Sequence, residues 1–281
     1  MINWYEKTEQ LTKELVKIKS VTEMPGEEQQ LADFIEGWYK GLPYFARHPQ
    51  QVLQFETQAD TVRRSSVLAM VKGTKNGGSN KTVILLGHLD TVDVQDYGDA
   101  KALATDPDRL PEALQHMGVS QEVLEDLKSG DYMFGRGALD MKAGVAAHMT
   151  LIDYFSRHTE LLCGNLIAVS ECDEEGNSAG IFSALEVLAH LKDEQQLDYI
   201  ACINSDYSTA DRNDPQRYIY VGSIGKILAC FAVFGKEAHV GQVFAGFDPN
   251  LLTAEITSQM CYSPALCDQR LGETTLPPVS L

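Results

Sequence analysis

The segment Thr82-Val-Ile-Leu-Leu-Gly-His88-Leu-Asp90 is an apolar run that ends in an imidazole and a carboxylate. A short apolar run of this kind predicts a buried β-strand. Because side chains alternate along a strand, His88 and Asp90 should lie on one side of the chain. This geometry suits a metal ligand and its orienting neighbour, since a ligating histidine usually donates its other ring N–H to a carboxylate or carbonyl. A His-x-Asp pair is common, however, so this segment alone does not establish a metal site.

Strand-like runs and helical patterns alternate on both sides of this segment. Further β-rich runs occupy Ser66–Val71, Asn165–Ser170 and Tyr199–Asn204. Apolar residues at helical spacing follow two of the strands, around Met141–Phe155 and Ala179–Leu191, and two amphipathic helices open the chain before residue 40. Such alternation predicts an α/β fold with a largely parallel, buried sheet.

Two departures from this alternation predict the domain organisation. The polar stretch from Thr91 to Met133 separates two core elements and is expected to form a rim loop or lid. Near residue 222 the pattern changes to a strand-like Gly225–Phe234 and a helix-like Asn250–Met260, so we place a domain boundary between residues 221 and 222. The ending Leu276-Pro-Pro-Val-Ser-Leu281 resembles a cut through a loop.

Charge and composition exclude several classes of partner. The 281 residues include 40 acidic and 23 basic side chains, giving a formal net charge of −17. That charge disfavours nucleic acid and anionic membrane surfaces. The sequence has no apolar stretch of roughly 18 to 20 residues and no leader-like start, which predicts a cytoplasmic protein. The six cysteines lack CxxC spacing, so neither disulfides nor a structural zinc knot is predicted.

Three more acidic positions follow apolar or glycine-rich segments. Gly135-Arg-Gly-Ala-Leu-Asp140-Met-Lys142 places a carboxylate at a turn before a helix, where, taken alone, it is better explained as an N-cap. The strand from Asn165 runs into Glu171-Cys-Asp-Glu-Glu175, which puts four acids within five residues. The last strand runs into Asp206. In parallel α/β sheets, ligands bind outside the carboxyl ends of the strands, so these endings should converge on one crevice. A cation there would compensate their mutual repulsion.

Taken in order, these motifs resemble those of the aminoacylase/carboxypeptidase-G-type zinc metallopeptidases. The matching elements are His88-x-Asp90, Gly135-Arg-Gly-x-x-Asp140-Met-Lys142, Asp173-Glu174-Glu175-Gly, Asp206 and Ala238-His239. The resemblance implies a three-layer, mostly parallel sheet of the zinc-exopeptidase type, with residues 1–221 forming a metal-binding catalytic domain. Residues 222–281 would be the first part of a smaller α+β lid or dimerisation domain. The residues Asn204-Ser-Asp-Tyr207 and the insert after Asp90 most resemble a branch associated with arginine utilisation.

The resemblance also implies a ligand set. His88 and Asp206 would hold one metal, Asp140 would bridge to a second metal, and Glu175 would bind that second metal. Two zinc ions are expected in a complete protein, and cobalt or manganese could substitute.

The remaining implied roles concern the reaction. Asp90 would orient His88, and Glu174 would be the general base that activates water for attack on an amide carbonyl. His239, in Lys236-Glu-Ala-His-Val-Gly241, would stabilise the oxyanion, often from a partner subunit in a homodimer built through the lid. The implied substrate is a small peptide or an N-acyl amino acid, in nitrogen or arginine metabolism.

One departure from the family pattern leaves an alternative open. The family supplies a final histidine to the second metal, whereas no histidine follows His239 in this sequence. The chain is therefore either a fragment or a shortened form, and the competing hypothesis is a catalytically silent metal-binding module. His148 is expected to be a packed or surface residue without a role, like the four other histidines outside the motifs.

Overall fold

The computed structural model describes residues 2–58, 60–208, 219–222, 230–261 and 263. Contacts between Cα atoms divide the chain into two compact units, Met1–Gln216 and Arg217–Leu281. The first unit contains the sheet, and its described residues form the elements on which the candidate site depends.

Five strands within the described residues form one sheet with the order β1-β2-β4-β3-β5. β3 is parallel to β4 and β5, whereas β2 is antiparallel to both of its neighbours. The predicted, mostly parallel sheet is thus confirmed, with β2 as the reversed strand. The strands are β1 (Val52–Glu56), β2 (Ser65–Lys72), β3 (Lys81–His88), β4 (Asn165–Glu171) and β5 (Asp198–Asn204).

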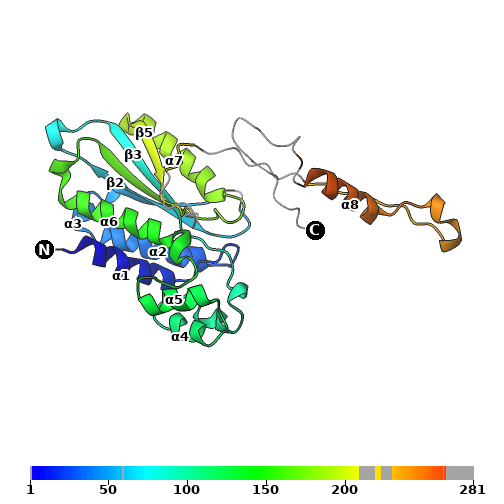
Figure 1. Ribbon diagram of the computed structural model, residues 1–281. Helices are drawn as coiled ribbons and strands as arrows, with labels where there is room; N and C mark the ends of the chain where they lie inside the picture. Colours follow the sequence, from blue (N-terminus) through cyan, green and yellow to red (C-terminus); the bar gives the residue numbers. More distant parts are fainter. Residues whose placement is uncertain (1, 59, 209–218, 223–229, 262, 264–281) are drawn as a thin grey trace. The chain divides into compact units, whose positions relative to one another are not determined.

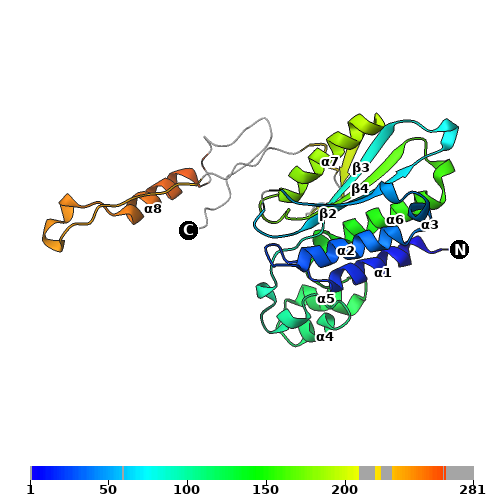
Figure 2. The ribbon, with the colours of Figure 1, turned by 180° about the vertical axis from the view of Figure 1, so that it is seen from behind.

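Helices cover both faces of the sheet and make three layers (Figure 1). One face packs on α1 (Trp4–Lys17), α2 (Glu27–Lys40), α3 (Pro43–Arg47) and α6 (Ala143–Arg157). The opposite face packs on α7 (Ala179–Gln195), as the reverse view also shows (Figure 2). β4 is buried along its whole length, which explains its nearly continuous apolar sequence.

Short helical segments complete the described chain. Those of the first unit are η1 (Pro49–Gln51), η2 (Lys75–Gly77), η3 (Gln95–Leu103), α4 (Leu110–Gln115), α5 (Gln121–Ser129), the π turn η4 (Ala138–Lys142) and η5 (Thr159–Leu161). Those of the second unit are η6 (Val240–Ala245) and α8 (Pro249–Met260). Among the described residues, no helix is both long and apolar enough to cross a bilayer.

The insert between residues 91 and 133 is largely helical. It is anchored to the loop Gly135-Arg136-Gly137, which precedes η4 and α6. The Arg136 guanidinium lies over the Tyr97 ring at 5.2 Å and pairs with Asp96 at 2.5 Å. The backbone N–H of Arg136 donates to the carbonyl of Ala104 at 2.7 Å. These contacts fix one end of the loop that leads to Asp140.

The described residues of the second unit have little regular structure besides η6 and α8. An isolated antiparallel bridge joins Lys236 to Phe247. The helix predicted over Asn250–Met260 is present as α8. The strand predicted over Gly225–Phe234 is wrong for residues 230–234, which form no strand, while residues 225–229 lie outside the described residues.

Gly180, in the first turn of α7, lets that helix approach the end of β4. A Cβ at this position would lie 2.0 Å from the carbonyl oxygen of Cys172 and 2.7 Å from its nitrogen. We therefore expect Gly180→Ala to destabilise the protein by roughly 1–3 kcal/mol, because backbone atoms must move to accommodate the methyl group. Urea denaturation followed by circular dichroism measures the change.

Gly37 provides a matched control in the exposed part of α2, where an added Cβ meets no atom within 4 Å. Gly37→Ala should stabilise the protein by roughly 0.5–1 kcal/mol, because alanine loses less backbone entropy in a helix. A Gly180→Ala protein as stable as the wild type would contradict the close packing of α7 on β4.

Candidate metal centre

The candidate site lies where β3, β4 and β5 end and where α6 begins. β3 ends at His88, which pairs in register with Glu171 at the end of β4. The chain then continues into Glu174 and Glu175, while β5 is followed two residues later by Asp206. Because these three strands are parallel, their carboxyl ends meet at one edge of the sheet.

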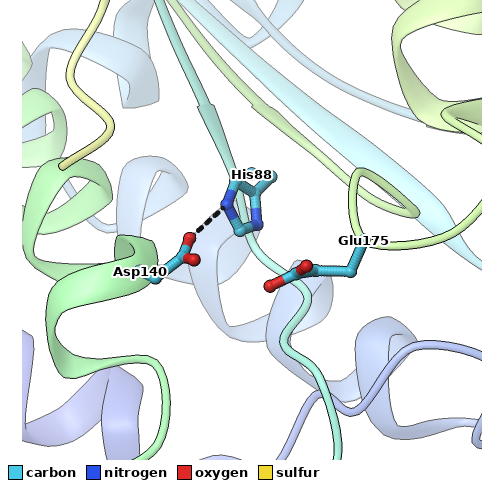
Figure 3. Close-up of side chains that lie close together, drawn as sticks. All are labelled: His88, Asp140 and Glu175. Carbon is cyan, nitrogen blue, oxygen red and sulfur yellow. Dashed lines mark hydrogen bonds and ion pairs between the residues drawn. The ribbon is translucent and has the colours of Figure 1, made fainter. Parts of the chain in front are cut away.

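His88, Asp140 and Glu175 come together at this edge, each offering one ligand atom, with all three atoms within 4.8 Å of one another. Figure 3 shows the three side chains approaching from different elements. The Nε2 atom of His88 lies 2.9 Å from Oδ1 of Asp140 and 4.0 Å from Oδ2 of Asp206. A nitrogen with several carboxylate oxygens is a donor set that zinc and related divalent ions accept.

The second ring nitrogen of His88 faces protein rather than the cluster. Nδ1 lies 3.0 Å from the backbone carbonyl of Asp90. A carbonyl oxygen can only accept, so Nδ1 must carry a proton. Without a metal, Nε2 shares a second proton with Asp140 at 2.9 Å, and a metal bound at Nε2 would replace that proton and leave it on Nδ1 alone. This is the tautomer that a metal ligand requires.

The carboxylate of Asp90 has a further role that sequence reasoning missed. It is fully buried and accepts the backbone N–H of Glu174 at 3.1 Å and that of Glu175 at 3.0 Å. Its Oδ1 is 3.5 Å from Nδ1 of His88, farther than the backbone carbonyl. Asp90 therefore joins the end of β3 to the acidic loop, residues 172–178, which follows β4.

The electrostatics of the cluster favour a bound cation. Burial raises the pKa of Glu174 and Glu175, and neighbouring carboxylates raise both further. Burial lowers the pKa of His88, but Asp90 and the other nearby carboxylates outweigh burial and raise that pKa to about 10. A divalent cation would relieve the repulsion between these acids. The residues present therefore fit a metal.

Glu171 adds an unsatisfied acid beside the cluster. Its Oε2 is buried and has no hydrogen-bond partner among the described residues. Burial raises the pKa of this carboxyl to about 8. A carboxyl with this pKa is mostly protonated at neutral pH, so Glu171 adds little negative charge to the metal-free site.

His239, the remaining predicted site residue, belongs to the second compact unit. There its Nδ1 accepts a hydrogen bond from the backbone N–H of Gly241 at 3.1 Å. Its predicted role in oxyanion stabilisation stays a prediction.

Two buried residues near the site were not assigned a role from sequence. Lys142 donates through Nζ to the carbonyls of Leu15 and Ile18, at 3.1 and 2.7 Å, and so ties the start of α6 to the end of α1. His148 is buried on α6, with Nε2 2.8 Å from the hydroxyl of Ser205, the residue before Asp206. The helical spacing of His148 indicated packing but could not reveal this partner.

A histidine and carboxylates gathered at the strand ends of a three-layer α/β fold are features of the zinc-exopeptidase class of proteins. Residues 84–274 match peptidase family M20/M25/M40. The chain therefore belongs to this family, and the metallopeptidase resemblance predicted from its motifs is confirmed.

Two curated relatives match the whole chain. It is 40% identical over 281 residues to Protein RocB of Bacillus subtilis and covers 49% of that protein. It is 36% identical over 286 residues to protein YqjN of the same organism and covers 50% of it. The chain thus spans about half the length of these relatives. The match to Protein RocB also supports the resemblance to one branch of the family that Asn204-Ser-Asp-Tyr207 and the insert after Asp90 indicated.

Two further matches are less extensive. Succinyl-diaminopimelate desuccinylase of Sulfurimonas denitrificans is 31% identical over 128 residues, which are 45% of this chain and 33% of that protein. Among solved structures, a tripeptidase from Staphylococcus aureus superposes with a TM-score of 0.50 at 18% identity, covering 92% of this chain and 57% of that one. The structural match supports the fold.

Replacement of Asp140 tests whether the cluster binds metal. Asp140→Asn keeps the shape of the side chain but removes its charge, so we expect zinc affinity to fall by at least about tenfold. Competition with a chromophoric chelator measures this affinity. Asp108→Asn is the control, because Asp108 is exposed and pairs with Lys17 on the surface. Equal zinc affinity in the wild type and Asp140→Asn would count against the site.

Proposed function

We propose that this chain carries the metal-dependent catalytic site of a hydrolase that cleaves amide bonds in small peptides or N-acyl amino acids. Membership of a peptidase family supports the reaction class. The observation that carries the proposal is the grouping of His88, Asp140 and Glu175 within 4.8 Å, with the backbone of Glu174 and Glu175 held by Asp90.

Glu174 is the residue we assign as general base. It is adjacent to the ligand Glu175 but is not part of the three-residue cluster, so its carboxylate is free to take a proton from water. Burial raises the pKa of Glu174, which strengthens this carboxylate as a proton acceptor. Water that loses its proton to Glu174 attacks the amide carbonyl, and the protonated Glu174 then returns the proton to the leaving amine.

The metal ligands in this proposal are His88, Asp140, Glu175 and Asp206. His88 and Asp206 would hold one ion, Glu175 would hold a second ion, and Asp140 would be the ligand shared by both. Two zinc ions are proposed, with cobalt or manganese as substitutes, and they would polarise the carbonyl and acidify water. Asp206 lies farther from His88 than Asp140 does, at 4.0 Å against 2.9 Å.

We assign residues 1–221 to the catalytic domain and 222–281 to part of a lid or dimerisation domain, whose His239 stabilises the oxyanion. A homodimer through this domain and a cytoplasmic location are part of the same proposal. The desuccinylase name describes removal of an N-acyl group, which supports N-acyl amino acids as substrates. A place in arginine metabolism rests on the resemblance to the RocB branch.

Glu174→Gln tests the proposed base. We expect kcat to fall by about 10²- to 10⁴-fold, because an amide cannot accept the proton, while the zinc content stays the same. A panel of N-acyl amino acids and dipeptides, with zinc content measured by atomic absorption, provides both readouts. Glu194→Gln is the control, because Glu194 is exposed and pairs with His190 on α7.

The competing hypothesis, a catalytically silent metal-binding module, predicts a different pattern. The wild type would then bind zinc but hydrolyse no member of the panel. If the wild type does hydrolyse the panel and Glu174→Gln remains fully active, Glu174 is not the base.

A further inference from the structure

Arg64 is a buried arginine that contacts three carboxylates outside the metal cluster. Its side chain is 2% exposed and lies 2.8 Å from Glu28, 2.6 Å from Asp60 and 3.0 Å from Asp173. Burying a charge costs several kcal/mol unless partners compensate it. The planar guanidinium meets all three acids at once, which the single ammonium of a lysine cannot do in the same geometry.

Asp173 is the member of this group that leads to the site. Its Oδ1 pairs with Arg64, and its Oδ2 accepts the backbone N–H of Ala179 at 2.9 Å. Its own N–H donates to Glu28 at 2.9 Å, and its carbonyl accepts from Ser178 at 2.7 Å. The side chain and both backbone groups of Asp173 are therefore all held.

The backbone of Asp173 is also in a conformation that needs support. Its φ is +64°, in the left-handed region that non-glycine residues seldom adopt. Such a conformation persists only when the surrounding contacts fix it. Arg64 and Glu28 supply those contacts, and the next two residues in the chain are Glu174 and Glu175.

The acidic loop is thus held from two sides. Asp90 accepts the backbone N–H groups of Glu174 and Glu175, and the Arg64–Glu28 pair holds Asp173 just before them. Loss of the Asp90 hydrogen bonds, or of the Arg64 and Glu28 contacts to Asp173, would let the side chains of Glu174 and Glu175 change direction. Because a misplacement of about 1 Å can cost a hundredfold in rate, this support bears directly on catalysis.

We propose that Arg64 is a positioning residue that, through Asp173 and together with Glu28, fixes the direction of the Glu174 and Glu175 carboxylates. This inference rests on the proposed function of those two glutamates. Arg64 itself contacts neither of them directly; it acts through the conformation of the loop.

Arg64→Lys is the test, because it retains the charge but cannot keep the three contacts. We expect kcat to fall by about 10- to 100-fold with KM changed less than twofold, and zinc affinity to fall by about tenfold, since Glu175 is a ligand. Both are measured well below the unfolding temperature. Arg63→Lys is the matched control, because the neighbouring Arg63 is 81% exposed and pairs with Glu56 on the surface.

Asp173→Asn is a second variant of nearly unchanged shape, which keeps the test decisive if Arg64→Lys does not fold. It should reduce kcat and zinc affinity in the same way. The double variant should lose less than the product of the two single losses, because both act through one contact. A folded Arg64→Lys or Asp173→Asn protein with wild-type kcat and zinc affinity would overturn the proposal.

The zinc titration separates this inference from the proposed function. If the wild type binds zinc but hydrolyses nothing, the proposed function fails, whereas a weaker zinc affinity in Arg64→Lys still supports positioning of Glu175. If the wild type is active and the variants lose only thermal stability, the hydrolase stands and the positioning role fails.

Discussion

The buried carboxylate of Asp90, bonded to the backbone N–H groups of Glu174 and Glu175, is the contact on which the site depends. The same residue receives Nδ1 of His88 on its carbonyl oxygen. One residue therefore sets the tautomer of the histidine and the position of the acidic loop. Asp90 lies just after β3 and the loop just after β4, so the parallel pairing of these strands is what brings the two within hydrogen-bond distance.

Concentrated negative charge is the second constraint on this edge of the sheet. His88 lies close to Asp90, Asp140 and Glu174, and these acidic neighbours raise its pKa to about 10. A fold that gathers acids in this way needs positive charge nearby. Arg64 supplies it for Asp173, Glu28 and Asp60. At the centre itself, the nitrogen and oxygen atoms of His88, Asp140 and Glu175 fit a divalent metal ion, whose positive charge would offset the negative charge of the acids.

Buried charged residues also connect the helical layers to the site. Lys142 joins the start of α6 to the carbonyls that end α1, and so holds the segment from which Asp140 projects. Arg64 joins α2, through Glu28, to the loop after β4. Lys142 is two residues after Asp140 in the chain, and Arg64 pairs with Asp173, two residues before Glu175. The helices on one face of the sheet therefore contribute to the geometry of the site as well as to the core.

The sequence by itself determined the α/β class, four of the five described strands, the opening helices and the ordered motif that contains His88, Asp140, Glu175 and Asp206. These features depend on local periodicity and on residue types at fixed spacing, which a single chain displays directly. Only the tertiary structure decided that β1 (Val52–Glu56) joins the sheet, that β2 runs antiparallel, that the Asp90 carboxylate holds the acidic loop, and that Arg64 contacts Asp173. These last features join residues far apart in the chain, and such pairings follow from packing and charge compensation in three dimensions, which leave no periodic trace in the sequence.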